Sequence, residues 1–166
     1  MKTILWLLSD SPEYSACMIA EEEPELIISV GYRYIIPEQV IKAFPNKIIN
    51  VHISALPWNR GADPNFWSFY DDTPKGVTIH YVDKGIDTGP IIAQELIVFD
   101  DDMTLRQTYE ILVKTGWRLL YENLEGIVKG TIKSIKQTHY KKDAFEMINS
   151  LPNGWDTKVK NIRSMK

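Results

Sequence analysis

Short runs of apolar residues recur along the first hundred positions, and many of them are rich in β-branched side chains. Such runs predict β-strands, and the nearly continuous ones predict strands that are covered on both faces. The predicted strands are residues 2–8, 25–30, 47–51, 76–82 and 90–99. Helical segments separate the early strands, so the sequence predicts an α/β fold whose sheet is parallel at first and antiparallel later.

Helical spacing and helix-boundary residues define the predicted helices. One covers residues 14–23, and another begins near Pro37, which suits the first turn of a helix. The longest begins at Thr104, where Gln107 three residues later completes a capping-box pattern. Its apolar positions keep helical spacing up to the glycines that precede residue 131.

The chain has 166 residues without an internal repeat or a linker, which predicts one domain. We expect the main fold over residues 1–128 and a C-terminal extension, residues 129–166, packed on the same domain. Residues 131–140 are expected to form a strand or a hairpin arm, and Trp155 to anchor the end. The aromatic side chains Trp67, Phe69 and Tyr70 are expected in the core, on a short helical segment.

Composition excludes several classes of protein. Hydrophobic residues make up 44% and charged residues 25%, as in ordinary globular domains. No apolar run approaches the roughly 20 residues of a transmembrane helix, so we expect no membrane span. The apolar start is too short for a signal peptide and predicts a buried strand and a cytoplasmic location. The single cysteine, Cys17, excludes an internal disulfide and is expected to be a buried hydrophobe on its helix.

The net charge of −3 is unevenly distributed, because basic residues outnumber acidic ones after residue 128. A basic end could attract a phosphorylated substrate, and a solvated basic surface is the alternative. An acidic chain without a basic recognition helix or an aromatic-basic platform does not predict nucleic-acid binding.

Three polar residues stand where catalysis is expected in an α/β fold. Asn50 and His52 end the third predicted strand and point to the same side of it. Asp87 lies in a loop bracketed by Gly85 and Gly89. These three side chains form a set suited to acyl transfer. The amide can donate to an oxyanion, the imidazole can carry protons, and the carboxylate can orient the imidazole. Ordinary buried polar residues are the alternative, and His80 in mid-strand is expected to be structural.

Longer motifs surround these residues. Residues 50–61, NVHISALPWNRG, are similar to the N-x-H-x-S-x-L-P-x-x-R-G motif of folate-dependent formyltransferases. Residues 76–83, GVTIHYVD, and 86–92, IDTGPII, resemble a second block of that family, and residues 31–36, GYRYII, resemble its folate-binding loop. The resemblance covers roughly residues 25–125 and implies a Rossmann-like formyltransferase domain, shortened at the N-terminus, with a mixed sheet flanked by helices.

The resemblance implies roles for the three polar residues. His52 would assist removal of a proton from the attacking amine, and Asn50 would donate to the formyl oxyanion. Asp87 would orient His52 and help move the proton to the departing folate amine. The implied formyl donor is 10-formyltetrahydrofolate, and no metal is implied. The implied folate contacts are Tyr32, Arg33, Tyr34, Ile35, Asp83 and Ile86.

The substrate side is less well defined. Arg60 and Asn65, in the loop after the third strand, would present polar side chains to the substrate. Closure of the loop is an alternative role for Arg60. His139, in the basic tail, could contact a substrate. The sequence lacks the phosphate loop of the glycinamide ribonucleotide enzymes and has no room for the basic RNA-binding barrel of the methionyl-tRNA enzymes. It most resembles the branch that formylates nucleotide-linked amino sugars for surface polysaccharides.

Two other functions remain open at this point. One is a folate-binding or regulatory module without turnover, and the other is a formyltransferase that acts on a small amine or ribonucleotide of primary metabolism. The shortened N-terminus would expose a sheet edge, so we expect a homodimer.

Overall fold

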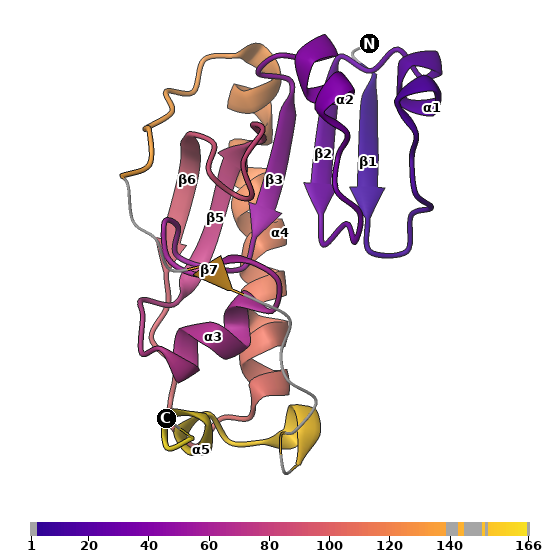
Figure 1. The fold of residues 1–166 in the computed structure, drawn as a ribbon. Helices are drawn as coiled ribbons and strands as arrows, with labels where there is room; N and C mark the ends of the chain where they lie inside the picture. The colour runs from indigo at the N-terminus through magenta and orange to yellow at the C-terminus, as the bar shows by residue number, and fades with distance from the viewer. Residues whose placement is uncertain (1–2, 139–142, 145–150, 152, 166) are drawn as a thin grey trace.

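A five-stranded mixed sheet forms the centre of the fold (Figure 1). The computed structural model describes residues 3–138, 143–144, 151 and 153–165. The strands lie in the order β1-β2-β3-β5-β6. Their bounds are Ile4–Leu8 for β1, Leu26–Val30 for β2, Ile48–His52 for β3, Gly76–Tyr81 for β5 and Ile91–Leu96 for β6. All five predicted strands are confirmed, with small shifts at their ends.

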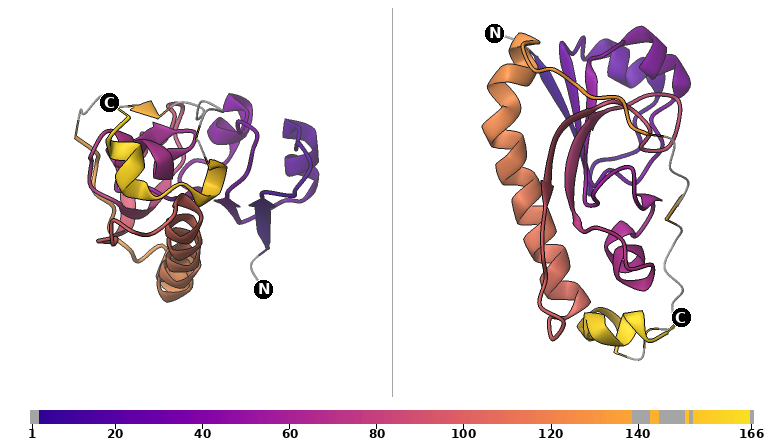
Figure 2. Two further views of the ribbon diagram at one scale, coloured as in Figure 1. Left: turned by 90° about the horizontal axis from the view of Figure 1, so that it is seen from below. Right: turned by 90° about the vertical axis from the view of Figure 1, so that its left-hand side faces the viewer.

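The direction of the strands changes in the middle of the sheet. β1, β2 and β3 are parallel, whereas β3, β5 and β6 are antiparallel, as the sequence predicts. Two short helices, α1 (Ala16–Glu21) and α2 (Glu38–Ala43), lie on one face of the sheet, and α4 (Leu105–Lys129) crosses the other face (Figure 2). The sheet is therefore covered on both sides.

Side chains of the central strands alternate between two cores. Ile27 and Ile48 pack in a cluster with residues of α1 and α2, whereas Ile28 and Ile49 pack in a cluster with residues of α4. This alternation follows from the period of two along a strand. It explains why β2 and β3 have nearly continuous apolar sequences, since both of their faces are buried.

The ends of α4 follow the predicted capping pattern. The Thr104 hydroxyl accepts from the Gln107 backbone N–H at 3.2 Å, and the Gln107 side chain accepts from the Thr104 N–H at 2.9 Å. The helix ends at Gly130, whose φ of 67° is in the left-handed region that glycine adopts most easily. None of the helices in the described ranges is long and apolar enough to cross a membrane.

The C-terminal residues return to the main fold below the sheet. The helices α3 (Pro64–Tyr70) and α5 (Val159–Arg163) pack together in a third apolar cluster, which contains Phe69 and is joined by Trp67 and Tyr70 as predicted. The two residues of β4 (Arg60–Gly61) pair in parallel with β7 (Asp143–Ala144). Trp155, on the 3₁₀ turn η1 (Gly154–Asp156), contacts Tyr109 of α4 with ring centroids 5.3 Å apart.

Two predictions are wrong in this structure. The described part of residues 131–140 forms no strand; it makes one isolated bridge, between Ile135 and Ile91 of β6. Cys17 is exposed rather than buried. The reason is helical spacing: α1 buries Ile19, and a residue two positions earlier lies on nearly the opposite side of a helix, which turns Cys17 to solvent.

Candidate active site

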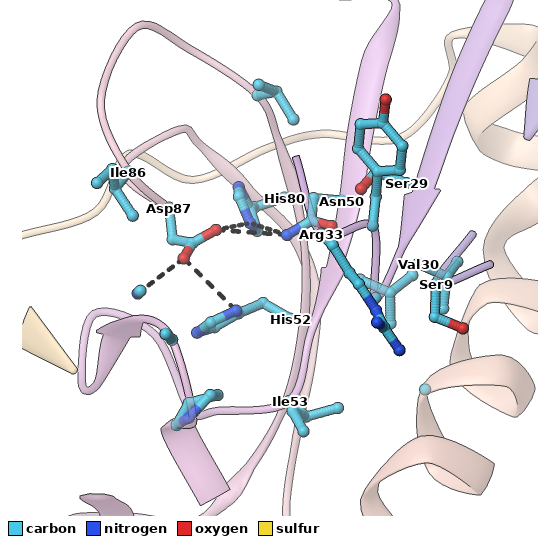
Figure 3. Close-up of a pocket in the computed structure, with 18 of the residues that line it drawn as sticks. Ser9, Ser29, Val30, Arg33, Asn50, His52, Ile53, His80, Ile86 and Asp87 are labelled. Carbon is cyan, nitrogen blue, oxygen red and sulfur yellow. Dashed lines mark hydrogen bonds and ion pairs between the residues drawn. The ribbon is translucent and has the colours of Figure 1, made fainter. Parts of the chain in front are cut away.

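A cavity of about 1240 Å³ opens at the carboxyl ends of the parallel strands. Its walls include the ends of β1, β2 and β3, the loop that follows β2 and the loop between β5 and β6 (Figure 3). In open α/β sheets this is the edge at which ligands bind. The sequence placed its candidate chemistry at the same edge.

Asn50, His52 and Asp87 meet in the wall of this cavity. The Asn50 amide donates to Asp87 Oδ1 at 3.3 Å, and His52 Nδ1 lies 3.5 Å from Asp87 Oδ2 (Figure 3). His52 is 7% exposed, so the contact with the carboxylate is largely shielded from solvent. The structure thus brings together three side chains that are 37 residues apart at most in the sequence.

A fourth side chain, His80, joins them. Its Nε2 atom lies 3.3 Å from Asp87 Oδ1 and 3.4 Å from Asn50 Nδ2, and its Nδ1 atom faces the Tyr81 carbonyl at 2.8 Å. These contacts are compatible with the structural role expected for His80 and place it within the site. It contacts the same carboxylate as His52, with the two rings edge to face and their centroids 6.3 Å apart.

The Asp87 carboxylate is held in its ionised form. Burial alone would raise its pKa, but the adjacent His52, the contact with His80 and the Gly61 backbone N–H together hold the pKa well below the usual value. The Gly61 N–H donates to Oδ2 at 2.9 Å. Asp87 therefore carries a fixed negative charge beside two imidazoles at neutral pH.

His52 has an oxygen opposite each ring nitrogen. Nδ1 faces Asp87, and Nε2 lies 3.0 Å from the carbonyl of Asn59, in the loop that follows β3. A protonated ring can donate to both oxygens, whereas a neutral ring can donate to only one. Contacts at both nitrogens therefore hold the His52 ring in place beside the carboxylate.

The loop that carries Asp87 is organised by its own side chains. Asp83 Oδ1 accepts from the Gly85 N–H at 3.0 Å and from the Thr88 hydroxyl. At Gly89, a Cβ atom would lie 1.8 Å from the Tyr81 carbonyl oxygen, so only glycine lets the two backbones approach. The motif glycine thus sets how closely the Asp87 loop returns to β5.

The residues expected to contact folate surround the same cavity. Tyr32, Arg33, Tyr34, Ile35, Asp83 and Ile86 all line it. Ile35 and Ile86 are 84% and 65% exposed, which leaves apolar surface on two sides of the opening. The hydroxyl of Tyr32 is used elsewhere, since it donates to the Pro12 carbonyl and accepts from the Tyr14 N–H. Tyr32 therefore holds the loop that follows β1.

The residues expected on the substrate side have other partners. Arg60 donates to the side chain of Gln137, which agrees with the alternative role of loop closure. Asn65 is 3% exposed, and its amide donates to the Leu105 carbonyl and the Thr108 hydroxyl of α4. These contacts fasten α3 to α4 and account for Asn65 without a substrate. His139 lies outside the described residues.

Two residues at the site were not assigned to it by sequence reasoning: His80 was expected to be structural, and Gln137 was not considered. His80 stands opposite Asn50 in the antiparallel pairing of β3 and β5, and Gln137 reaches the Asp87 loop from the C-terminal extension. The alternating pattern of β5 could have placed His80 on one face, but nothing local marks Gln137.

Among the described residues no group of three His, Cys, Asp or Glu side chains is arranged to hold a metal ion.

Comparison with known proteins agrees with this geometry. The family model described as formyl transferase matches residues 9–124. The methionyl-tRNA formyltransferase of Desulfotalea psychrophila is 37% identical over 122 residues, and that of Acetivibrio thermocellus is 30% identical over 158 residues. The matches cover 73% and 93% of this chain but 38% and 50% of those proteins. The chain thus spans no more than about half the length of these curated relatives.

Solved structures include a chain of similar length. The formyltransferase PseJ from Anoxybacillus kamchatkensis, solved with UDP-4,6-dideoxy-4-formamido-L-AltNAc and tetrahydrofolate, has a TM-score of 0.87 and 37% identity; the match covers 96% of this chain and 97% of that one. The N-formyltransferase from Helicobacter canadensis, in complex with folinic acid and dTDP-3-aminofucose, has a TM-score of 0.66 and 29% identity over 72% of this chain and 44% of that one. The chain therefore belongs to the formyl transferase family.

Proposed function

We propose that this protein transfers a formyl group from 10-formyltetrahydrofolate to the primary amine of a nucleotide-linked amino sugar. The observation that carries the proposal is the buried Asp87 carboxylate, which contacts Asn50, His52 and His80 at the wall of a cavity that the predicted folate loop also lines. Such a set can stabilise an oxyanion and move a proton without a metal.

The reaction assigns one task to each side chain. The amine nitrogen attacks the formyl carbon, and the carbonyl oxygen becomes an oxyanion to which the Asn50 amide donates. His52 takes the proton that the amine releases as the C–N bond forms, for which Nε2 has to turn from the Asn59 carbonyl toward the cavity, and Asp87 stabilises the charged imidazole. The bond from the formyl carbon to the folate nitrogen then breaks, and that nitrogen receives the proton as tetrahydrofolate leaves.

The amino-sugar substrate is supported by similarity to solved structures that contain such sugars. PseJ, whose structure contains a UDP-linked formamido sugar, matches this chain along nearly the whole of both sequences. The methionyl-tRNA enzymes match it over half of their length or less. The cytoplasmic location and a role in surface polysaccharide synthesis stay predictions.

The direct test is turnover with purified protein, 10-formyltetrahydrofolate and a panel of UDP- and dTDP-linked amino sugars. Mass spectrometry should detect an added formyl group on a sugar of the panel, together with release of tetrahydrofolate. Asn50→Ala should abolish the product, whereas the exposed α4 variant Lys114→Ala should not. Tight folate binding without formylation of any amine would instead favour a binding or regulatory module.

A further inference from the structure

Gln137 lies in the C-terminal extension, yet its amide joins two loops of the active site. The side-chain oxygen accepts from Arg60 Nε at 3.1 Å and from Arg60 Nη2 at 2.7 Å. The side-chain nitrogen donates to the carbonyl oxygens of Asp87 and Gly89, at 2.8 and 2.7 Å. One amide therefore links the loop after β3 to the loop that carries the carboxylate.

The bonding capacity of this amide is fully used. A glutamine side chain offers two N–H groups and an oxygen with two lone pairs, and all four find partners here. The opposite orientation would turn the NH₂ group toward the guanidinium of Arg60, which has no acceptor. The orientation of Gln137 is thus set by its neighbours.

The extension is fastened on both sides of Gln137 by backbone pairing. Ile135 and Ile91 exchange two N–H···O bonds of 2.8 Å each, and further along the chain β7 pairs with β4. Gln137 is therefore not needed merely to keep the extension in place. The hydrogen bonds of its side chain instead connect the two loops of the active site.

Both loops position the same carboxylate. Asp87 has a φ of 50°, a left-handed conformation that is unfavourable for a residue with a side chain unless its surroundings enforce it. Gly61, which donates to the Asp87 carboxylate, directly follows Arg60. Gln137 therefore holds the backbone of Asp87 on one side. On the other side it holds Arg60, the residue next to Gly61, whose N–H donates to the Asp87 carboxylate.

We propose that Gln137 is a positioning residue for the reaction: it holds the Asp87 carboxylate in register with His52 and Asn50 without touching the substrate. The proposal rests on the proposed function for its kinetic consequence but not for its structural one. Loss of the bridge lets the Asp87 loop relax, and a misplacement of about 1 Å can cost on the order of a hundredfold in rate.

The first experiment is a double-mutant cycle of Gln137→Met and Asp87→Asn. Methionine keeps the length of the glutamine side chain and removes its polar atoms. We expect kcat to fall about tenfold to a hundredfold, with KM for 10-formyltetrahydrofolate within about threefold of the original value. In the Asp87→Asn background the same change should have little further effect on kcat, because Gln137 acts through Asp87.

Gln94→Met is the matched control. The Gln94 amide also donates to two oxygens, the Leu56 carbonyl and the Thr78 hydroxyl, at 2.8 Å each, and both of these partners lie outside the Asp87 loop. Its effect on kcat should be additive with Asp87→Asn. If Gln137→Met were also additive, or if it raised KM and left kcat unchanged, the positioning role would be wrong.

A second measurement does not depend on turnover. The Asp87 carboxyl can be titrated by ¹³C NMR in the original protein, in Gln137→Met and in Gln94→Met. Gln137→Met should raise the pKa of Asp87, because the carboxylate loses its fixed contacts, and Gln94→Met should leave it unchanged. An unshifted titration in Gln137→Met would overturn the inference even if the enzyme proved to have another substrate. Absence of turnover with a shifted titration would count against the proposed function alone.

Discussion

At the scale of single residues, the site is organised around one buried carboxylate. Asp87 accepts from the Asn50 amide and the Gly61 N–H and faces the rings of His52 and His80. A carboxylate removed from water is stable only when such groups replace its hydration. The same contacts that keep Asp87 charged also fix the positions of the residues proposed to act on the substrate.

His52→Asn should abolish turnover while folate affinity stays within a fewfold of the original. Loss of a general base costs about a hundredfold to ten-thousandfold in rate, and the predicted folate contacts lie in other loops. Steady-state kinetics and calorimetry with a non-transferable folate analogue measure the two effects separately. An equal loss of both would show that His52 maintains the site instead of acting in the reaction.

The ionisation of Asp87 makes stability depend on pH. Its pKa is lower in the folded state than in the unfolded chain, so the carboxylate stabilises the fold at neutral pH, and this contribution is lost as the pH falls below about 4. Urea denaturation should show a steeper loss of stability on acidification for the original protein than for Asp87→Asn. Parallel pH profiles would mean that Asp87 titrates alike in both states.

Sequence reasoning found the residues of the site that lie within local motifs. Period two placed Asn50 and His52 on one side of a strand, and the glycine-bracketed loop marked Asp87. His80 could not be assigned in the same way, because its approach depends on the register that pairs it with Asn50 across two antiparallel strands. Gln137 is separated from Asp87 by 50 residues, and only the folded path of the extension brings it there.

At the scale of elements, α4 determines how β3 is held. Gly116 of α4 lies against Val51, the residue between Asn50 and His52, and a Cβ atom there would be 2.9 Å from Val51 Cγ1. Real Cβ atoms do not approach carbon so closely, so the helix depends on this glycine to reach the sheet. The capping pattern and the helical spacing predicted α4, but not the side on which it packs.

Gly116→Val should lower the free energy of unfolding by about 1–3 kcal/mol, because the added atoms overpack the contact between α4 and β3. The control is Lys114→Val on the same helix, whose side chain is exposed and whose loss of helix propensity is on the order of 0.5 kcal/mol. Chemical denaturation of both variants provides the comparison. Equal effects would mean that the sheet can move away from the helix at little cost.

At the scale of the whole molecule, β1 is an edge strand of a short sheet. Trp6 on this strand lies beside Trp117 of α4, with ring centroids 6.0 Å apart, and the two side chains are 36% and 41% exposed. Tyr121, one helical turn beyond Trp117, is 82% exposed. Aromatic surface next to an edge strand is typical of contacts between protein chains.

The homodimer expected from the sequence stays a prediction, and this surface is where we expect it to form. Sedimentation equilibrium should give twice the mass of the chain, and Trp6→Glu should shift the protein toward monomer, because a charge would be buried in the contact. Lys129→Glu, on an exposed position near the end of α4, should leave the mass unchanged. A monomer at every concentration of the original protein would exclude the contact.

The return of the C-terminal extension to the Asp87 loop has a consequence for biosynthesis. A ribosome delivers the entire sheet and α4 before it has added Gln137 and β7. The residues of the two clusters on the faces of the sheet therefore precede Gln137, whereas the third cluster is incomplete until α5 has been added. A polypeptide that ends before Gln137 would thus contain the sheet and α4 but lack both the amide that reaches the Asp87 loop and part of the third cluster.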